Sequence, residues 1–100
     1  MEKDYLLNRA SLFAIANREN RPLGFGCPES GLYIFTYVFT TKESAQRYLD
    51  SRDTKIKGIC SIVGPFGNFK ALMAHFDFRG SGHGFRFFDE KGHAVLEHHA

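Results

Sequence analysis

The stretch R79-G-S-G-H-G-F-R-F-F-D-E-K-G-H93 holds the residue types best suited to chemistry. It contains five aromatic or histidine rings, two arginines and four glycines within fifteen residues. Glycines between Arg79 and Arg86 suggest a phosphate cradle, but the lysine and the hydroxyl of a P-loop are missing. The third glycine of a dinucleotide fingerprint is also absent, since Phe85 or Phe87 stands at its position. The stretch therefore predicts a loop that leads into a strand, with two arginines available to a partner.

Two segments resemble the nucleic-acid-binding motifs of RNA-recognition domains. S81-G-H-G-F-R-F-F88 is similar to the RNP1 octapeptide, and L32-Y-I-F-T-Y37 is similar to the shorter RNP2. The resemblance implies that bases would stack on Tyr33, His83 and Phe85. The octapeptide departs from the pattern, because serine replaces its basic first residue and arginine its aliphatic sixth residue. The twelve residues that follow it are too few for the last helix and strand of that fold.

His75 and Asp77 form the pair best placed for acid–base catalysis. Two residues apart, they share a face on a strand but point about 200° apart on a helix. Cys27 and Cys60 have no base beside them in the sequence, and their separation gives neither a zinc motif nor a disulfide scaffold, so we expect two buried free thiols. A small enzyme or ligand carrier that uses His75 or His83 is therefore an alternative hypothesis.

Histidines also gather near the end of the chain. A terminal hairpin would bring His83 close to His93, His98 and His99, and imidazoles suit zinc, nickel or copper. Their spacing matches no metal-binding signature, and V-L-E-H-H-A resembles the beginning of a vector-encoded tag. We expect no metal site and no cofactor.

Composition limits the class of protein. The chain has 100 residues, enough for one domain spanning 1–100, and its 43% hydrophobic and 15% aromatic content exceeds that of a disordered chain. A formal net charge of +2 is too mild to imply nucleic acid or an anionic membrane. The polar start lacks a secretory apolar region, and no apolar run approaches the roughly 20 residues that span a bilayer. We expect a globular cytoplasmic protein without a membrane segment.

The first third of the chain fits two structures. Residues 4–18 begin with Asp4, a suitable N-cap, and carry apolar residues at helical spacing, so we predict a helix there. The alternative is a strand through L-F-A-I-A that turns at N-R-E-N-R and returns through P-L-G-F-G. The choice decides whether this segment packs on the sheet or belongs to it.

The clearest local pattern follows. Residues 32–39 are dense in β-branched and aromatic side chains, which predicts a strand. Thr40 and Glu43 have the spacing of a capping box, so a helix is expected at about 41–52. Glu43 and Arg47 are one turn apart on this helix and are expected to pair.

The second half of the chain continues the alternation of strands and helices. Residues 55–63 predict a strand ended by G-P-F-G, which should lie parallel to the first strand, adjacent to it or nearly so. Apolar spacing favours a helix over residues 68–79, with a long hairpin strand as its rival. Residues 85–98 predict a hairpin whose D-E-K-G turn places Gly92 in a left-handed conformation.

These elements predict an α+β domain. We expect four or five mostly antiparallel strands in one sheet, with two or three helices mainly on one face. Alternation puts Tyr33, Phe35, Tyr37 and Phe39 on one face of their strand, and Leu32, Ile34 and Val38 on the other. Two interpretations remain open: a central strand covered on both faces, or a strand whose ring-bearing face is partly open, since so many rings are hard for a small domain to bury.

The sequence therefore favours a small binding or regulatory protein that contacts another protein, for instance as an inhibitor. The predicted contact residues are Tyr33, Phe35, Tyr37, Arg79, His83, Phe85 and Arg86. A second copy of the chain is an alternative partner. Single-stranded nucleic acid bound on the aromatic sheet face is the competing hypothesis, with strong salt dependence as its signature.

Overall fold

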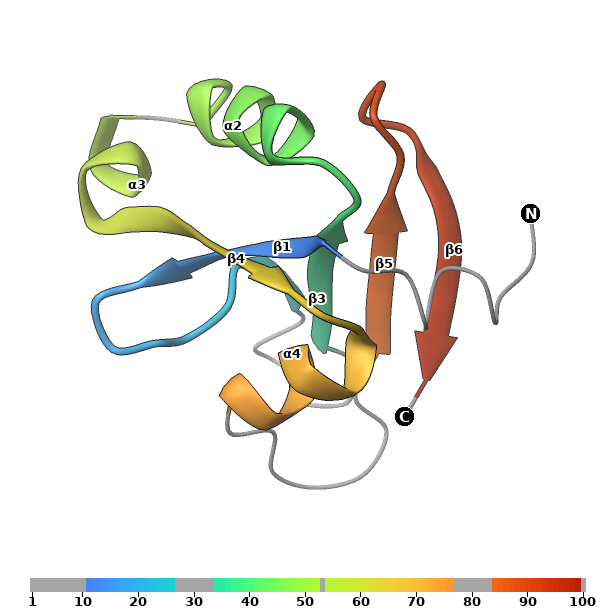
Figure 1. Cartoon of the computed structure of the whole chain (residues 1–100). Coiled ribbons are helices and arrows are strands. Elements are labelled where there is room, and N and C mark those ends of the chain that lie inside the picture. Colours follow the sequence, from blue (N-terminus) through green and yellow to red (C-terminus); the bar gives the residue numbers. More distant parts are fainter. Residues whose placement is uncertain (1–10, 27–33, 53, 77–83, 100) are drawn as a thin grey trace.

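A mixed sheet forms the centre of the molecule, shown in Figure 1 by a computed structural model that describes residues 11–26, 34–52, 54–76 and 84–99. The strands are β1 (Leu12–Asn17), β2 (Gly24–Gly26), β3 (Ile34–Phe39), β4 (Cys60–Phe66), β5 (Gly84–Phe88) and β6 (Ala94–His99). The helices are α2 (Lys42–Asp50), α3 (Thr54–Ile59) and α4 (Phe69–His75). Five strands follow the order β4-β1-β3-β5-β6, and the short β2 pairs with β3. Only β3 and β5 pair in parallel among these strands, so the predicted α+β fold with a mostly antiparallel sheet is confirmed.

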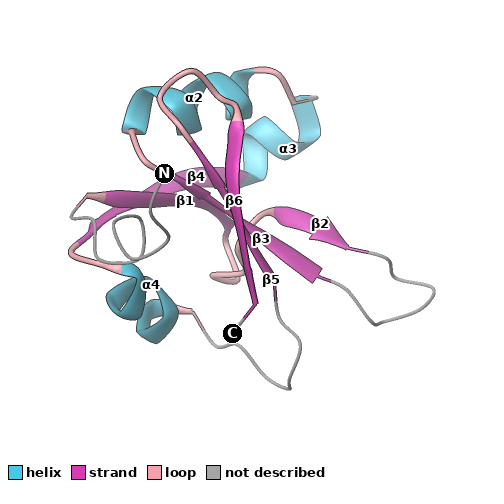
Figure 2. Cartoon of the chain, turned by 90° about the vertical axis from the view of Figure 1, so that its right-hand side faces the viewer, coloured by secondary structure: helices cyan, strands magenta, loops and turns pink. Residues whose placement is uncertain are grey.

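Helices lie on both faces of the sheet, with α2 and α3 on one side and α4 on the other (Figure 2). The core on the α4 side is built from Leu12, Ala14, Ala16, Val38, Phe66, Phe69, Leu72, Phe76, Phe85 and Phe87. The core on the α2 side is built from Ile15, Tyr37, Phe39, Ala45 and Leu49. Two of the three described helices thus share a face, and each side of the sheet buries its own apolar cluster.

The helix predicted over residues 4–18 is wrong for the part that the structure describes, because Leu12–Asn17 forms strand β1. Leu12 and Ala14 contribute to the core on the α4 side, whereas Ile15 contributes to the core on the α2 side. Alternation between two covered faces is the burial pattern of a strand, and it outweighs the helical spacing seen in sequence. The alternative prediction is confirmed, since the chain turns after Asn17 and returns as β2; residues 4–10 lie outside the described residues.

The strand predicted over residues 55–63 is wrong in its first half, because Thr54–Ile59 forms helix α3. Pairing with β1 begins where Asn17 meets Cys60, so the residues before Cys60 have no strand beside them. The strand then continues beyond the predicted end, and Phe66 at its last position is buried. Both β3 and β4 run antiparallel to β1, which lies between them, so the predicted parallel relation is confirmed.

Helix α2 is confirmed, but it begins one residue later than the predicted capping box. Thr41 is the N-cap, and its hydroxyl accepts a hydrogen bond from the Ser44 amide at 3.1 Å. Thr40 instead donates its hydroxyl to the Phe88 carbonyl at 3.0 Å, which ties the end of β3 to the end of β5. This bond fixes the distance between the start of α2 and the hairpin that follows β5.

The last hairpin is confirmed as predicted. The helix predicted over residues 68–79 is confirmed for Phe69–His75 (α4), but it ends earlier than predicted because Phe76 is already extended, and residues 77–79 lie outside the described residues. Asn68 caps α4 by accepting a hydrogen bond from the Ala71 amide at 2.8 Å. The turn between β5 and β6 closes through the bond from the Gly92 amide to the Asp89 carbonyl at 3.0 Å, and Gly92 has φ 86° as predicted.

No helix among the described ranges is both long and apolar enough to cross a bilayer.

Candidate functional site

The two faces of β3 differ in what covers them. Thr36 and Val38 point to the α4 side and are almost fully buried, whereas Phe35, Tyr37 and Phe39 point to the α2 side. This alternation confirms the predicted faces at these positions. On the α2 side, the exposed fraction of the side chains rises toward the beginning of β3. Phe39 is 1% exposed, Tyr37 is 8% exposed and Phe35 is half-buried. The α2 side of the sheet is therefore open at the beginning of β3.

Four rings pack together on the α2 side: Tyr37, Phe39, Tyr48 and Phe88. Tyr37 meets Phe88 edge to face at 5.1 Å between ring centroids, and Phe39 stacks on Phe88 at 5.2 Å. Burial and then the neighbouring Tyr37 raise the pKa of the Tyr48 phenol, while the Arg52 guanidinium opposes that rise. Tyr48 and Phe88 are half-buried, so the cluster joins the core to the surface.

Arg86 lies at the open end of this cluster. Its guanidinium carbon stands 5.0 Å from the centre of the Phe35 ring, a cation–π contact. Its Nη2 is 2.7 Å and its Nε is 3.0 Å from Oε1 of Glu97, which faces it across the β5–β6 pair. Two partners thus hold the arginine in one orientation, with about 30% of its side chain exposed. Together, Phe35, Tyr37, Tyr48, Arg86 and Phe88 form a surface that we call the aromatic face.

Three of the seven predicted contact residues come together on the aromatic face: Phe35, Tyr37 and Arg86. Phe85 is 0% exposed on the α4 side, where its ring meets Phe69 edge to face at 4.7 Å. The three others, Tyr33, Arg79 and His83, lie outside the described residues. Phe85 therefore contributes packing in this structure and no exposed ring.

Tyr48 and Phe88 were missed as members of the aromatic face. The helical spacing of Tyr48 from the buried Ala45 and Leu49 is the signal that places it against the sheet, but that spacing does not indicate that it lies beside Phe88. The position of Phe88 depends on the register that pairs it with Phe39. Paired residues of neighbouring strands share a face of the sheet, and sequence pattern alone gives no information on register between distant strands.

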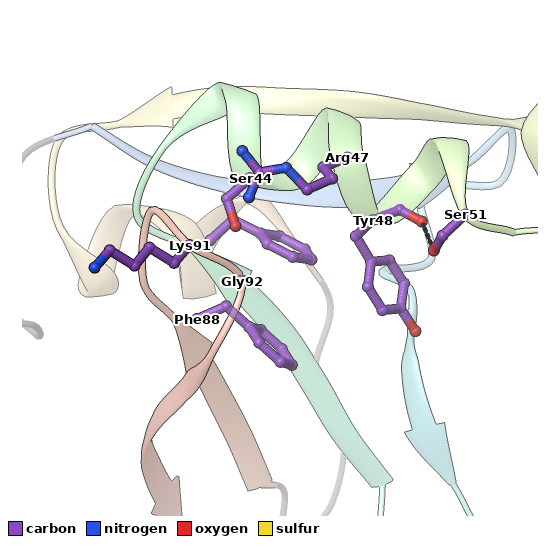
Figure 3. Close-up of a pocket in the computed structure, with 8 residues that line it drawn as sticks. Ser44, Arg47, Tyr48, Ser51, Phe88, Lys91 and Gly92 are labelled. Atoms are coloured by element: carbon purple, nitrogen blue, oxygen red, sulfur yellow. Dashed lines mark hydrogen bonds between the residues drawn. The ribbon is translucent and has the colours of Figure 1, made fainter.

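A pocket of about 260 Å³ continues the aromatic face between α2 and the β5–β6 turn (Figure 3). The lining residues are Phe39, Ser44, Arg47, Tyr48, Ser51, Phe88, Lys91 and Gly92. Glu43 and Arg47 are both described in the structure, but they do not form the predicted ion pair. Arg47 instead directs Nη1 toward the Glu90 carbonyl at 3.5 Å, across the pocket mouth. The pocket therefore combines ring surfaces with two cationic side chains.

The carboxylate of Asp89 holds the turn that forms one wall of this pocket. Its Oδ1 accepts hydrogen bonds from the backbone amides of His93 at 2.8 Å and Lys91 at 3.0 Å. These bonds hold the pKa of the carboxyl below its ordinary value of 3.8, and the bond from His93 has the largest effect. A carboxyl with a lowered folded-state pKa stabilises the fold above its unfolded-state pKa, and that contribution disappears as pH falls through the folded-state value.

We therefore expect the Lys91 amide to lose its hydrogen-bonded chemical shift only in acid, below about pH 4. An NMR pH titration of the Lys91 and His93 amides measures this loss. In Asp89→Asn, the side-chain oxygen still accepts hydrogen bonds but no longer titrates, so the acid transition at Lys91 should vanish. An unchanged transition in that variant would show that another group controls the turn.

Of the residues considered for catalysis, the structure describes His75 and Cys60, and the surroundings of both are typical of structural residues. His75 Nε2 lies 3.1 Å from Asn20 Oδ1, and Asn20 donates Nδ2 to the His75 carbonyl at 3.1 Å. Burial raises the pKa of the half-buried Cys60 thiol, which lowers its reactivity at neutral pH. Cys27 and Asp77 lie outside the described residues, and within the described part no group of three or more metal-ligating side chains converges.

Known proteins do not indicate a family or a function for this chain. Comparison of the chain with protein-family models, with curated proteins and with solved structures found no match.

Proposed function

We propose that this chain is a small cytoplasmic binding protein that regulates another protein by direct contact through the aromatic face, in the manner of an inhibitor. The observation that carries the proposal is the placement of Arg86, which is held over the half-buried Phe35 ring by Glu97 beside a partly open cluster of rings. Aromatic residues and arginine are the types enriched at protein interfaces and among the residues that dominate binding energy.

Preorganisation supports the same proposal. An arginine that is already fixed by a ring and a carboxylate loses less side-chain entropy when a partner docks. Tyr37, Tyr48 and Phe88 are also fixed by one another: Tyr37 meets Tyr48 and Phe88 edge to face at centroid distances of 5.4 and 5.1 Å, and Tyr48 and Phe88 make a tilted contact at 6.3 Å. A partner would therefore meet a rigid surface, which favours binding at a lower ordering cost.

Nucleic acid is less well supported by the described residues. Phe85, one of the three rings expected to stack on bases, is fully buried on the opposite side of the sheet. The charge of Arg86 is paired with Glu97 at 2.7 Å, which reduces its attraction for phosphate. The remaining stacking candidates, Tyr33 and His83, are outside the described residues.

An affinity capture from native lysate tests the proposal, with half of the lysate treated with nuclease. The variants Phe35→Ala and Arg86→Gln remove the two central groups of the aromatic face. Truncating a dominant contact residue costs about 2 kcal/mol or more, so we expect retention of the partner to fall at least about thirtyfold. Ile59→Ala is the matched control, because Ile59 is an apolar side chain, 50% exposed, on α3 rather than on the aromatic face.

The proposal holds if one protein is retained in both halves, lost with Phe35→Ala and Arg86→Gln, and kept with Ile59→Ala. Material that disappears after nuclease treatment would instead establish nucleic-acid binding. Sedimentation of the purified chain identifies a second copy as the partner, since Phe35→Ala would then convert a dimer into a monomer. Thermal unfolding of each variant shows whether a loss of binding reflects loss of the fold.

A further inference from the structure

The pocket between α2 and the β5–β6 turn has an unsatisfied hydroxyl in its wall. Ser44 is 2% exposed, and its Oγ has no hydrogen-bond partner among the described residues. The backbone amide of the same residue is satisfied by Thr41 at 3.1 Å, so the helix cap does not use the side chain. A buried hydroxyl without a partner is unfavourable for folding, which points to an acceptor or donor that binds there.

Cationic side chains stand at the mouth of the pocket. Arg47 makes a contact of only 3.5 Å with the Glu90 carbonyl, close to the limit of a hydrogen bond, and keeps donors to spare. Lys91 forms no ion pair with another described residue. The carboxylate of Asp89 in the same turn accepts hydrogen bonds from the amides of Lys91 and His93, and it interacts with the Lys91 side chain only through its charge. Among the side chains that line the pocket, Arg47 and Lys91 carry positive charge and none is acidic, so the pocket mouth favours an anion.

The interior of the pocket is apolar. Phe39, Tyr48 and Phe88 contribute ring surfaces, and Phe39 and Phe88 stack with an interplanar angle of 18°. Figure 3 shows Ser44, Arg47, Tyr48 and Ser51 on α2, with Phe88, Lys91 and Gly92 opposite them on the hairpin. The Ser51 hydroxyl donates to the Tyr48 carbonyl at 2.6 Å, which leaves Ser44 as the serine of the lining whose hydroxyl has no hydrogen-bond partner.

We propose that this pocket binds a small carboxylic acid with a compact aromatic or branched apolar body. The body lies against the Phe39, Tyr48 and Phe88 rings, and the carboxylate accepts hydrogen bonds from Arg47 and from the Ser44 hydroxyl. A planar guanidinium matches a carboxylate in two-point geometry, and Lys91 adds charge at the rim. A volume of about 260 Å³ is slightly smaller than typical drug-sized sites, so the ligand is small. This inference does not depend on the proposed function.

Amide-shift titration of the whole chain by NMR tests the proposal with three matched probes: 3-phenylpropanoate, 3-phenylpropanamide and 2-phenylethylammonium. We expect saturable shifts at the Ser44, Arg47 and Gly92 amides with the carboxylate. The neutral amide should bind about tenfold more weakly and the ammonium more weakly still, because each loses the charge-assisted bonds. Absence of saturation with 3-phenylpropanoate in the millimolar range, or shifts centred elsewhere, would overturn the proposal.

Substitutions separate a ligand role from a structural one. Ser44→Ala removes the unsatisfied hydroxyl, so the thermal midpoint should stay constant or rise while affinity for 3-phenylpropanoate falls about fivefold. Arg47→Gln should reduce that affinity about tenfold, whereas Lys70→Gln on α4 should leave it unchanged. A lower thermal midpoint for Ser44→Ala would show that the hydroxyl serves the fold, and unchanged affinity in Arg47→Gln would show that the cation is not used. Either result contradicts the proposed site.

Discussion

Replacing Phe85 with alanine is expected to reduce the free energy of unfolding by about 3–5 kcal/mol. The ring is 0% exposed and meets Phe69 edge to face at 4.7 Å, beneath helix α4. Its removal leaves a cavity between β5 and α4 and takes away the aromatic contact that positions the helix. Urea unfolding followed by circular dichroism measures the change. A loss of this size is a large part of the stability of a domain of about 100 residues.

Phe35→Ala is the matched control for Phe85→Ala. Phe35 is also a phenylalanine of the central sheet, but it is half-buried on the α2 side, where Arg86 covers its ring. We expect the control to cost no more than about 1.5 kcal/mol, because part of the ring already contacts water and the cation–π contact is worth about 1 kcal/mol. Equal losses for the two variants would contradict the assignment of Phe85 to the core and Phe35 to the surface.

Replacing Gly24 with alanine is expected to cost about 3 kcal/mol, at the upper end of the overpacking range. A Cβ at this position would collide with the Phe35 carbonyl, and the atoms that it meets belong to backbone and cannot rotate away. Gly24 faces Thr36 in the β2–β3 pair, so β2 would have to separate from β3. The same separation would disturb Phe35 and weaken binding through the aromatic face.

Gly67→Ala tests whether the effect is specific to that close approach. A Cβ at Gly67 would meet nothing within 4 Å, so we expect a change within about 0.5 kcal/mol. Denaturant unfolding compares the two variants under one condition. If Gly24→Ala were as mild as Gly67→Ala, β2 would not lie on β3 as described.

Elements with strong local patterns were predictable from the sequence. Strand β3 has six residues rich in β-branched and aromatic side chains, helix α4 has apolar residues at helical spacing, and the last hairpin has its left-handed Gly92. These patterns arise within the element itself. Strand β1 and the start of β4 could not be predicted in this way, because Leu12–Asn17 becomes a strand through pairing with both β3 and β4, and its length decides where β4 begins.

The candidate site was predictable only in part, for the same reason. Alternation along β3 placed Phe35 and Tyr37 on one face, but the register of β5 was unknown. The parallel pair sets Phe85 beside Thr36 and Arg86 beside Tyr37, so the two consecutive residues fall on opposite sides of the sheet. A register shifted by one residue would have exchanged them. The hydroxyl of Ser44 and the pocket around it depend on tertiary contacts and leave no pattern in the sequence.

Amide hydrogen exchange of the chain, measured with and without the captured partner, shows which surface the partner covers. If the aromatic face is the contact surface, added protection is expected in the second half of α2, around Tyr48, and in the β5–β6 strands near Arg86 and Phe88. Helix α4 and strand β4 should exchange as in the free chain. Protection confined to α4 or β4, with α2 and the β5–β6 strands unchanged, would show that the partner binds another surface and not the aromatic face.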